Sequence, residues 1–133
     1  MWLAHETGAR CLSVQRSFPV EAEALSEVRH FVRDQAAAAP LSPVGVADLV
    51  LAVSEACSIF LHGGSASKMH VRCRLSEQLV EVEVSDHGPL SIEASPAQLA
   101  LQLMREIADE LEIIDDSGDR GPARIRLAKR LPR

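Results

Sequence analysis

HVRCRLSEQLVEVEV, residues 70–84, holds two segments in which apolar and polar side chains alternate. A period of two is the pattern of a strand with one buried face and one solvated face. If the four residues between the segments form the turn, Arg74 lies opposite Glu81 and Arg72 lies opposite Glu83. Cross-strand pairs of opposite charge stabilise such a register. The stretch therefore predicts an antiparallel hairpin with one charged face and one face packed on a core.

A strand and two helices are predicted on the N-terminal side of this hairpin. Residues 12–18 alternate in the same way up to Pro19, which predicts a first strand. Residues 21–36 place apolar side chains at the spacing of one helical face. Ser42-Pro43 then combines a hydroxyl cap with a proline at the first helical position, so a second helix is expected from there to about His62, before two glycines.

A third helix and two further strands are predicted on the C-terminal side. Ser95-Pro96 repeats the pattern of cap and proline, and the helix that it opens is expected to run to about Leu111. Its expected apolar side consists of Leu99, Leu103, Met104, Ile107 and Leu111. The two last strands are expected at residues 111–115 and 123–129, around a turn at residues 117–121.

The order of these elements predicts an α/β fold. Sheets with a charged outer face and an apolar inner face carry their helices on one side only. We therefore expect a two-layer α/β sandwich, with a mostly antiparallel sheet of about five strands and three helices on one face. A chain of 133 residues has the size of one domain, here residues 1–133, in which residues 1–10 are expected to be flexible.

Composition excludes several classes of function. Aromatic residues make up only 3% of the chain and the net charge is -5, so a nucleic-acid partner is not expected. Charged residues interrupt the apolar stretches, which argues against a membrane span. The three cysteines (Cys11, Cys57 and Cys73) are far apart in the sequence and are expected to be free thiols in a cytoplasmic protein. The five histidines show no metal-ligand spacing, so no metal site is expected.

The second helix carries one feature that the core does not explain. At about 100° per residue, one apolar arc collects Val46, Leu49, Val50, Val53, Ala56, Cys57, Phe60 and Leu61. Glu55 and Ile59 lie on the opposite side, with Leu51 towards its edge. Either this side is a solvated face that tolerates one isoleucine, or it is a second buried surface formed by a pocket or a partner. The second alternative predicts an apolar environment for both Ile59 and Leu51.

Four segments, taken in order, resemble one branch of the histidine-kinase-like ATPases (the GHKL superfamily, or Bergerat fold), the bacterial anti-sigma factors that are serine kinases. LAVSEACS, residues 51–58, resembles their N-box helix, and VSDHGP, residues 84–89, resembles their D-x-G-P-G motif. Residues 99–113 are similar to the helix that follows their glycine-rich lid, and Phe18-Pro19 with the helix after it is also typical. The resemblance covers about residues 12–131 and implies the fold expected above.

The resemblance also assigns roles at the phosphate end of a nucleotide site. Glu55 matches the glutamate that activates the attacking group, and is here a vestigial general base. The family's magnesium-ligating asparagine, four residues later, is replaced by Ile59, and the chain contains no asparagine at all. Gln98 and Ala100 stand where the family has two glycines at the start of the lid helix. Side chains at these positions hinder the close approach of backbone amides to phosphates.

At the adenine end the motif is partly kept. Asp86 matches the aspartate that accepts the adenine amino group, and Gly88 matches the glycine beside it, whereas Leu90 replaces the next glycine. Asp86 is equally interpreted as a turn residue at the end of a strand, because Asp-His-Gly is ordinary turn chemistry.

Two functions therefore compete at this point. The first is an anti-sigma-factor-like regulator of a bacterial partner-switching pathway, a pseudokinase that binds a sigma factor or an anti-anti-sigma (STAS) protein, or dimerises with itself or a related kinase. No cofactor is expected in that case. The alternative is an ATP-dependent serine/threonine protein kinase that phosphorylates a STAS protein and uses ATP and magnesium. A regulator unrelated to sigma factors is a third possibility.

Overall fold

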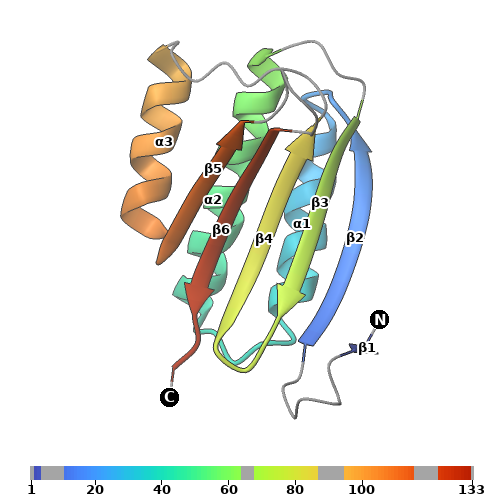
Figure 1. Cartoon of the computed structure of the whole chain (residues 1–133), viewed down its shortest axis with the longest axis vertical. Coiled ribbons are helices and arrows are strands. Elements are labelled where there is room, and N and C mark those ends of the chain that lie inside the picture. The colour runs from blue at the N-terminus through green and yellow to red at the C-terminus, as the bar shows by residue number, and fades with distance from the viewer. Residues whose placement is uncertain (1, 4–10, 64–67, 87–94, 116–122, 133) are drawn as a thin grey trace.

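The structure, a computed structural model, describes residues 2–3, 11–63, 68–86, 95–115 and 123–132. One sheet with the strand order β1-β2-β3-β4-β6-β5 carries three helices on one face (Figure 1). The strands are β1 (Trp2–Leu3), β2 (Cys11–Pro19), β3 (Lys68–Leu75), β4 (Leu79–Asp86), β5 (Glu110–Asp115) and β6 (Ala123–Arg130). The helices are α1 (Ala24–Ala36), α2 (Pro43–Gly63) and α3 (Ser95–Ile107). Neighbouring strands are antiparallel throughout.

This architecture confirms the predicted two-layer α/β fold and adds one short strand to it. Trp2 and Leu3, in β1, pair with Leu12 and Cys11 at the free edge of β2. They are the only residues among the first ten that the structure describes, so the expected flexibility of residues 1–10 stays a prediction. In the helical layer, α2 lies between α1 and α3 and packs against both (Figure 1).

The hairpin β3–β4 has the register that the charges predict. Arg72 pairs with Glu83 and Arg74 with Glu81, with nitrogen–oxygen distances of 3.1 Å and 3.7 Å. Arg126 of β6 extends the pattern, because its guanidinium lies 3.0 Å from Glu81. These pairs lie on the face of the sheet away from the helices, so each contributes modestly, on the order of 1 kcal/mol or less. Their combined effect is to fix the register of three neighbouring strands.

The predicted start of α2 is confirmed. The amide N–H of Gly45 donates to Oγ of Ser42 at 3.0 Å, which satisfies one of the free donors of the first turn. By length and composition alone, Pro43–Leu61 of α2 is long and apolar enough to cross a membrane. Half of that segment is buried inside the domain, as in the core helix of a folded domain.

α1 and α3 have different bounds from those predicted. α1 begins at Ala24 and not at residue 21, because a tight turn comes first, in which Glu21 N–H donates to Pro19 O at 2.9 Å. α3 ends at Ile107 and not at Leu111. Leu111 instead belongs to β5, which pairs with β6 along its whole length. Pairing of β5 with the next strand, β6, thus outweighs the helical propensity of residues 108–111.

The C-terminal end of α3 is held by a lysine from the sheet. Nζ of Lys129, in β6, donates to the carbonyl oxygen of Ile107 at 3.0 Å. The same ammonium group lies 3.8 Å from carboxylates of Asp48 in α2 and Asp109 after α3. A cation at this place satisfies a free carbonyl and interacts favourably with the helix dipole. Lys129 therefore connects α2, α3 and the sheet.

The core contains two free thiols. Cys57 of α2 and Cys73 of β3 are buried, as their apolar-phase positions predict. Burial raises the pKa of each thiol to about 12, an effect that Arg29 partly offsets at Cys57. Both groups are therefore protonated at neutral pH and behave as small apolar side chains.

Candidate functional site

The contact between α2 and α3 contains the residues that the resemblance assigns to magnesium and the lid. Ile59 is only 2% exposed. It follows Val50 by nine residues and therefore faces the opposite side of α2, and α3 covers α2 on the side away from α1 (Figure 1). Ile59 is therefore buried, as the second alternative predicts, but within the chain itself and not by a partner. Leu51 does not share this environment, since it is 42% exposed, and that part of the prediction is wrong.

α3 presents small side chains to this contact. Its buried residues are Ala97, Ala100, Leu101 and Met104, which are all 4% exposed or less. Leu99, predicted to lie on the apolar side of the helix, is 68% exposed, so the predicted phase is wrong at this position. Alanines in place of leucines allow two helices to approach closely, and this explains why the helix turns Ala100 and not Leu99 inward. Gln98 is exposed.

Ala100 and Ile59 therefore have a packing role in this structure. Both positions belong, by resemblance, to the part of a nucleotide site that holds phosphates and magnesium. Magnesium takes hard oxygen ligands, and a hydrocarbon side chain supplies none. Within the described residues, no group of three or more His, Cys, Asp or Glu side chains could hold a metal ion. The residues present at this contact do not fit a magnesium–phosphate group.

Glu55 and Asp86, the two acidic residues assigned to the site, occupy different environments. Glu55 is half-buried on α2, one helical turn before Ile59. Asp86 is the last residue of β4, pairs in register with Ala123 of β6 and is only 3% exposed. Asp86 thus ends a strand, as both interpretations expect, and the turn that would follow it lies outside the described residues. Gly88 and Leu90 lie outside the described residues, so the adenine end remains a prediction.

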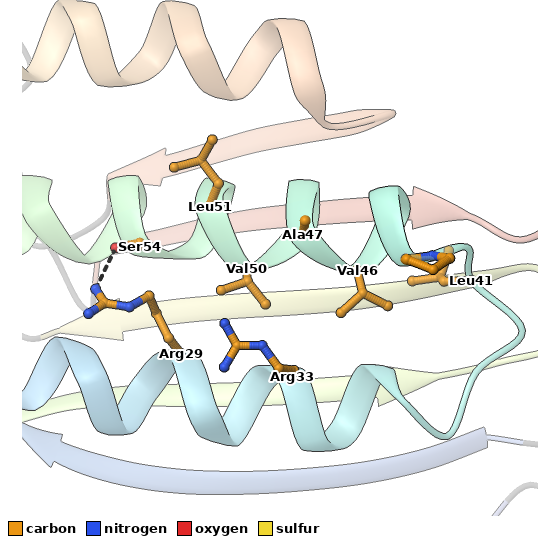
Figure 2. A pocket seen from close by; sticks show the side chains of 9 residues that line it. Arg29, Arg33, Leu41, Val46, Ala47, Val50, Leu51 and Ser54 are labelled. Carbon is orange, nitrogen blue, oxygen red and sulfur yellow. Dashed lines mark hydrogen bonds between the residues drawn. The ribbon is translucent and has the colours of Figure 1, made fainter.

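A second candidate site, which the sequence reasoning missed, lies between α1 and α2. This cavity, here called the α1–α2 groove, has a volume of about 640 Å³. Its lining consists of Arg29, Arg33, Leu41, Pro43, Val46, Ala47, Val50, Leu51 and Ser54. Figure 2 shows both guanidinium groups between the two helices, and Nη1 of Arg29 donates to Oγ of Ser54 at 3.3 Å. The available signal was the spacing of Arg29 and Arg33, four residues apart on one helical face.

Comparison with known proteins agrees with the fold. A family model described as "Histidine kinase-like ATPase domain" matches residues 18–128. Among solved structures, the chain is similar to the crystal structure of the RsbU and RsbW domains of Rv1364c from Mycobacterium tuberculosis. The TM-score is 0.73 at 22% identity, and the match covers 92% of this chain and 33% of the other. The chain thus spans about a third of the length of that protein. None of the curated proteins matches the chain.

Proposed function

The chain belongs to the histidine kinase-like ATPase domain family, and on this premise we propose that it acts by binding a partner protein, as an anti-sigma-factor-like regulator without nucleotide turnover. The main observation in support of this proposal is the burial of Ile59, on the side of α2 that packs against α3. Catalysis of phosphoryl transfer depends on positioning and on neutralising charge with metal ions. An apolar contact at the metal position offers neither.

The energetic argument favours a closed contact over an open cleft. Separating α3 from α2 would expose Ile59, Leu101 and Met104 to water. Each large apolar side chain contributes about 1.5–3 kcal/mol when it is fully buried. The binding energy of a nucleotide would have to exceed this cost before any affinity is measurable. A charged triphosphate beside these hydrocarbons would in addition lose its hydration without gaining a metal ligand.

The partners that we propose are a sigma factor or an anti-anti-sigma (STAS) protein, and a homodimer or a heterodimer with a related kinase is a further form. Membership in the family and the fold shared with a structure that contains an RsbW domain support this choice. Partner binding through helix surfaces needs no γ-phosphate, so it is expected to be independent of ATP.

A second candidate function is a serine/threonine protein kinase that uses ATP and magnesium. Two observations favour it: Glu55 keeps the position of the activating glutamate, and Asp86 is a buried carboxylate at the end of β4. Among the residues that the structure describes, Asp86 is the only buried charged side chain. Perturbed or buried acids are frequent at functional sites, although structural roles also bury them.

The two functions are separated by one binding experiment. The protein is mixed with sigma factors and STAS proteins from its own source, with ATP, with ADP, or after apyrase treatment, and complexes are resolved by size-exclusion chromatography. Our proposal predicts the same complex in all three conditions and no phosphoserine by mass spectrometry. A complex that forms only with ATP would establish the kinase. Phosphorylation of the partner by the unmodified protein, but not by the Glu55→Gln variant, would also establish the kinase.

A further inference from the structure

We propose that the α1–α2 groove binds a helix of the partner protein, an amphipathic segment with apolar residues on one face and carboxylates along its edge. This inference rests on the proposed function, because it names the surface that the partner uses and the chemistry of the segment that binds there. The groove is distinct from the contact of α2 with α3, since Val50 of its floor lies on the opposite side of α2 from Ile59.

The floor of the groove is apolar and partly open to solvent. Val46, Ala47 and Val50 of α2 form it, and Leu51, which is 42% exposed, lies at its edge and points away from α1 (Figure 2). Exposed apolar side chains that are scattered singly are normal on any protein. Here the exposed side chains of Ala47 and Leu51 line the same groove as the partly buried Val46, and exposed apolar grooves of this kind mark binding sites. The floor therefore suits an apolar ligand face.

The charge of the groove selects an acidic ligand. The chain has 19 acidic and 14 basic residues, yet the lining contains two arginines and no acidic residue. Within the described residues, neither Arg29 nor Arg33 has a carboxylate within 4.0 Å, whereas Arg72 and Arg126 of the sheet do. Arg29 and Arg33 are one helical turn apart, so they can receive two carboxylates that are also spaced by one turn.

The shape of the groove favours a helix over an extended segment. From Pro43 to Ser54, α2 spans eleven residue steps, or roughly 16 Å and three turns. Both walls are helices, whose backbone groups are paired internally, so no strand edge is present to which an extended segment could add. A helix brings its own satisfied backbone and can place residues i, i+3 and i+7 on the apolar floor. We therefore commit to a helical occupant.

Two synthetic helical peptides of 16 residues are the probes. Both carry leucines at i, i+3, i+4 and i+7, and the flanking positions are glutamates in one and lysines in the other. Fluorescence anisotropy of the labelled peptides with the full chain measures binding. We expect a Kd below about 100 μM for the acidic peptide, binding at least about tenfold weaker for the basic peptide, and loss of this difference in about 0.5 M salt.

Matched variants locate the binding surface. The double substitution Arg29→Glu and Arg33→Glu should weaken binding of the acidic peptide at least about tenfold and strengthen binding of the basic peptide. Arg105→Glu, on the exposed surface of α3, is the control and should change either affinity less than about twofold. Leu51→Asp should weaken binding of both peptides. Leu99→Asp makes the same change at an exposed leucine outside the groove and should leave both affinities unchanged. Far-UV circular dichroism confirms that each variant is folded.

Three outcomes overturn the inference. They are equal affinity for the two peptides, no binding of either, or loss of binding in the Leu99 variant as much as in the Leu51 variant. A concentration-dependent dimer that Leu51→Asp dissociates would show that the occupant is a second copy of the chain. If a sigma factor or STAS protein binds the Leu51 variant normally, the groove assignment alone fails. If no such protein binds while the acidic peptide does, the proposed function fails and the groove remains.

Discussion

Replacing Ile59 by asparagine, the residue that ligates magnesium in the family by resemblance, should strongly destabilise a closed apolar contact but not an open nucleotide cleft. Ile59 is 2% exposed, so the substitution removes nearly all of the free energy from burying its side chain, about 1.5–3 kcal/mol. An amide without a partner in that place adds about 1–3 kcal/mol. The free energy of unfolding should therefore fall by about 2.5–6 kcal/mol, a large fraction of the roughly 5–15 kcal/mol that is typical of a domain.

Urea unfolding followed by far-UV circular dichroism measures this loss. Ile59→Val serves as the control, because it removes one methylene and should cost only about 0.5–1.5 kcal/mol. In an open cleft the asparagine would be hydrated and the two variants would be similarly stable. A loss below about 1 kcal/mol in the asparagine variant would refute the account of the α2–α3 contact. Stabilisation of that variant by Mg-ATP, absent in the valine control, would show that the cleft opens.

Two further predictions concern residues outside this contact. Lys129→Met should lower the free energy of unfolding by about 1–2 kcal/mol, because it removes the contacts that connect α2, α3 and β6. Lys68→Met, at an exposed strand end, is the control and should change this free energy little. Urea unfolding measures both variants. Cys57 and Cys73 should not react with a thiol reagent such as DTNB at pH 7 in the native state. Burial raises the pKa of each thiol to about 12 from 9.0. Stability should therefore be constant below about pH 8 and fall above it as the unfolded thiols ionise, by about 1.4 kcal/mol per thiol at pH 10. A flat profile from about pH 8 to 10.5 would contradict this.

The sequence predicted those parts of the fold that local signals determine. Alternation and charge set the register of Arg72 and Arg74 against β4, and the cap at Ser42 set the start of α2. Each of these signals lies within a few residues of the structure that it specifies. They needed no knowledge of how distant segments meet.

The parts that were not predicted depend on contacts between separate elements. The end of α3 at Ile107 follows from the pairing of β5 with β6, which no local pattern in residues 108–111 indicates. The orientation of α3 was predicted from its leucines, but its contact with α2 selects Ala97 and Ala100 for their small size. Helical periodicity locates an apolar face, yet it does not distinguish a face suited to close packing from one that stays exposed.

The candidate sites divide in the same way. Ile59 could be identified from the sequence, because a helical wheel placed it away from the core arc and the resemblance assigned its position to a magnesium ligand. The α1–α2 groove could not, since the helical wheel assigned Val46 and Val50 to the core arc without showing that both residues border a groove beside α1. A groove between two helices depends on their separation, and that separation is a tertiary property.

The central claim is that the α2–α3 contact has replaced a working nucleotide site. Isothermal titration calorimetry of the unmodified protein with ATP, in the presence and absence of magnesium, tests it directly. We predict no saturable heat up to about 1 mM nucleotide in either condition, which corresponds to a binding free energy weaker than about -4 kcal/mol. A Kd of order micromolar, about -8 kcal/mol, that disappears when magnesium is removed would contradict the claim.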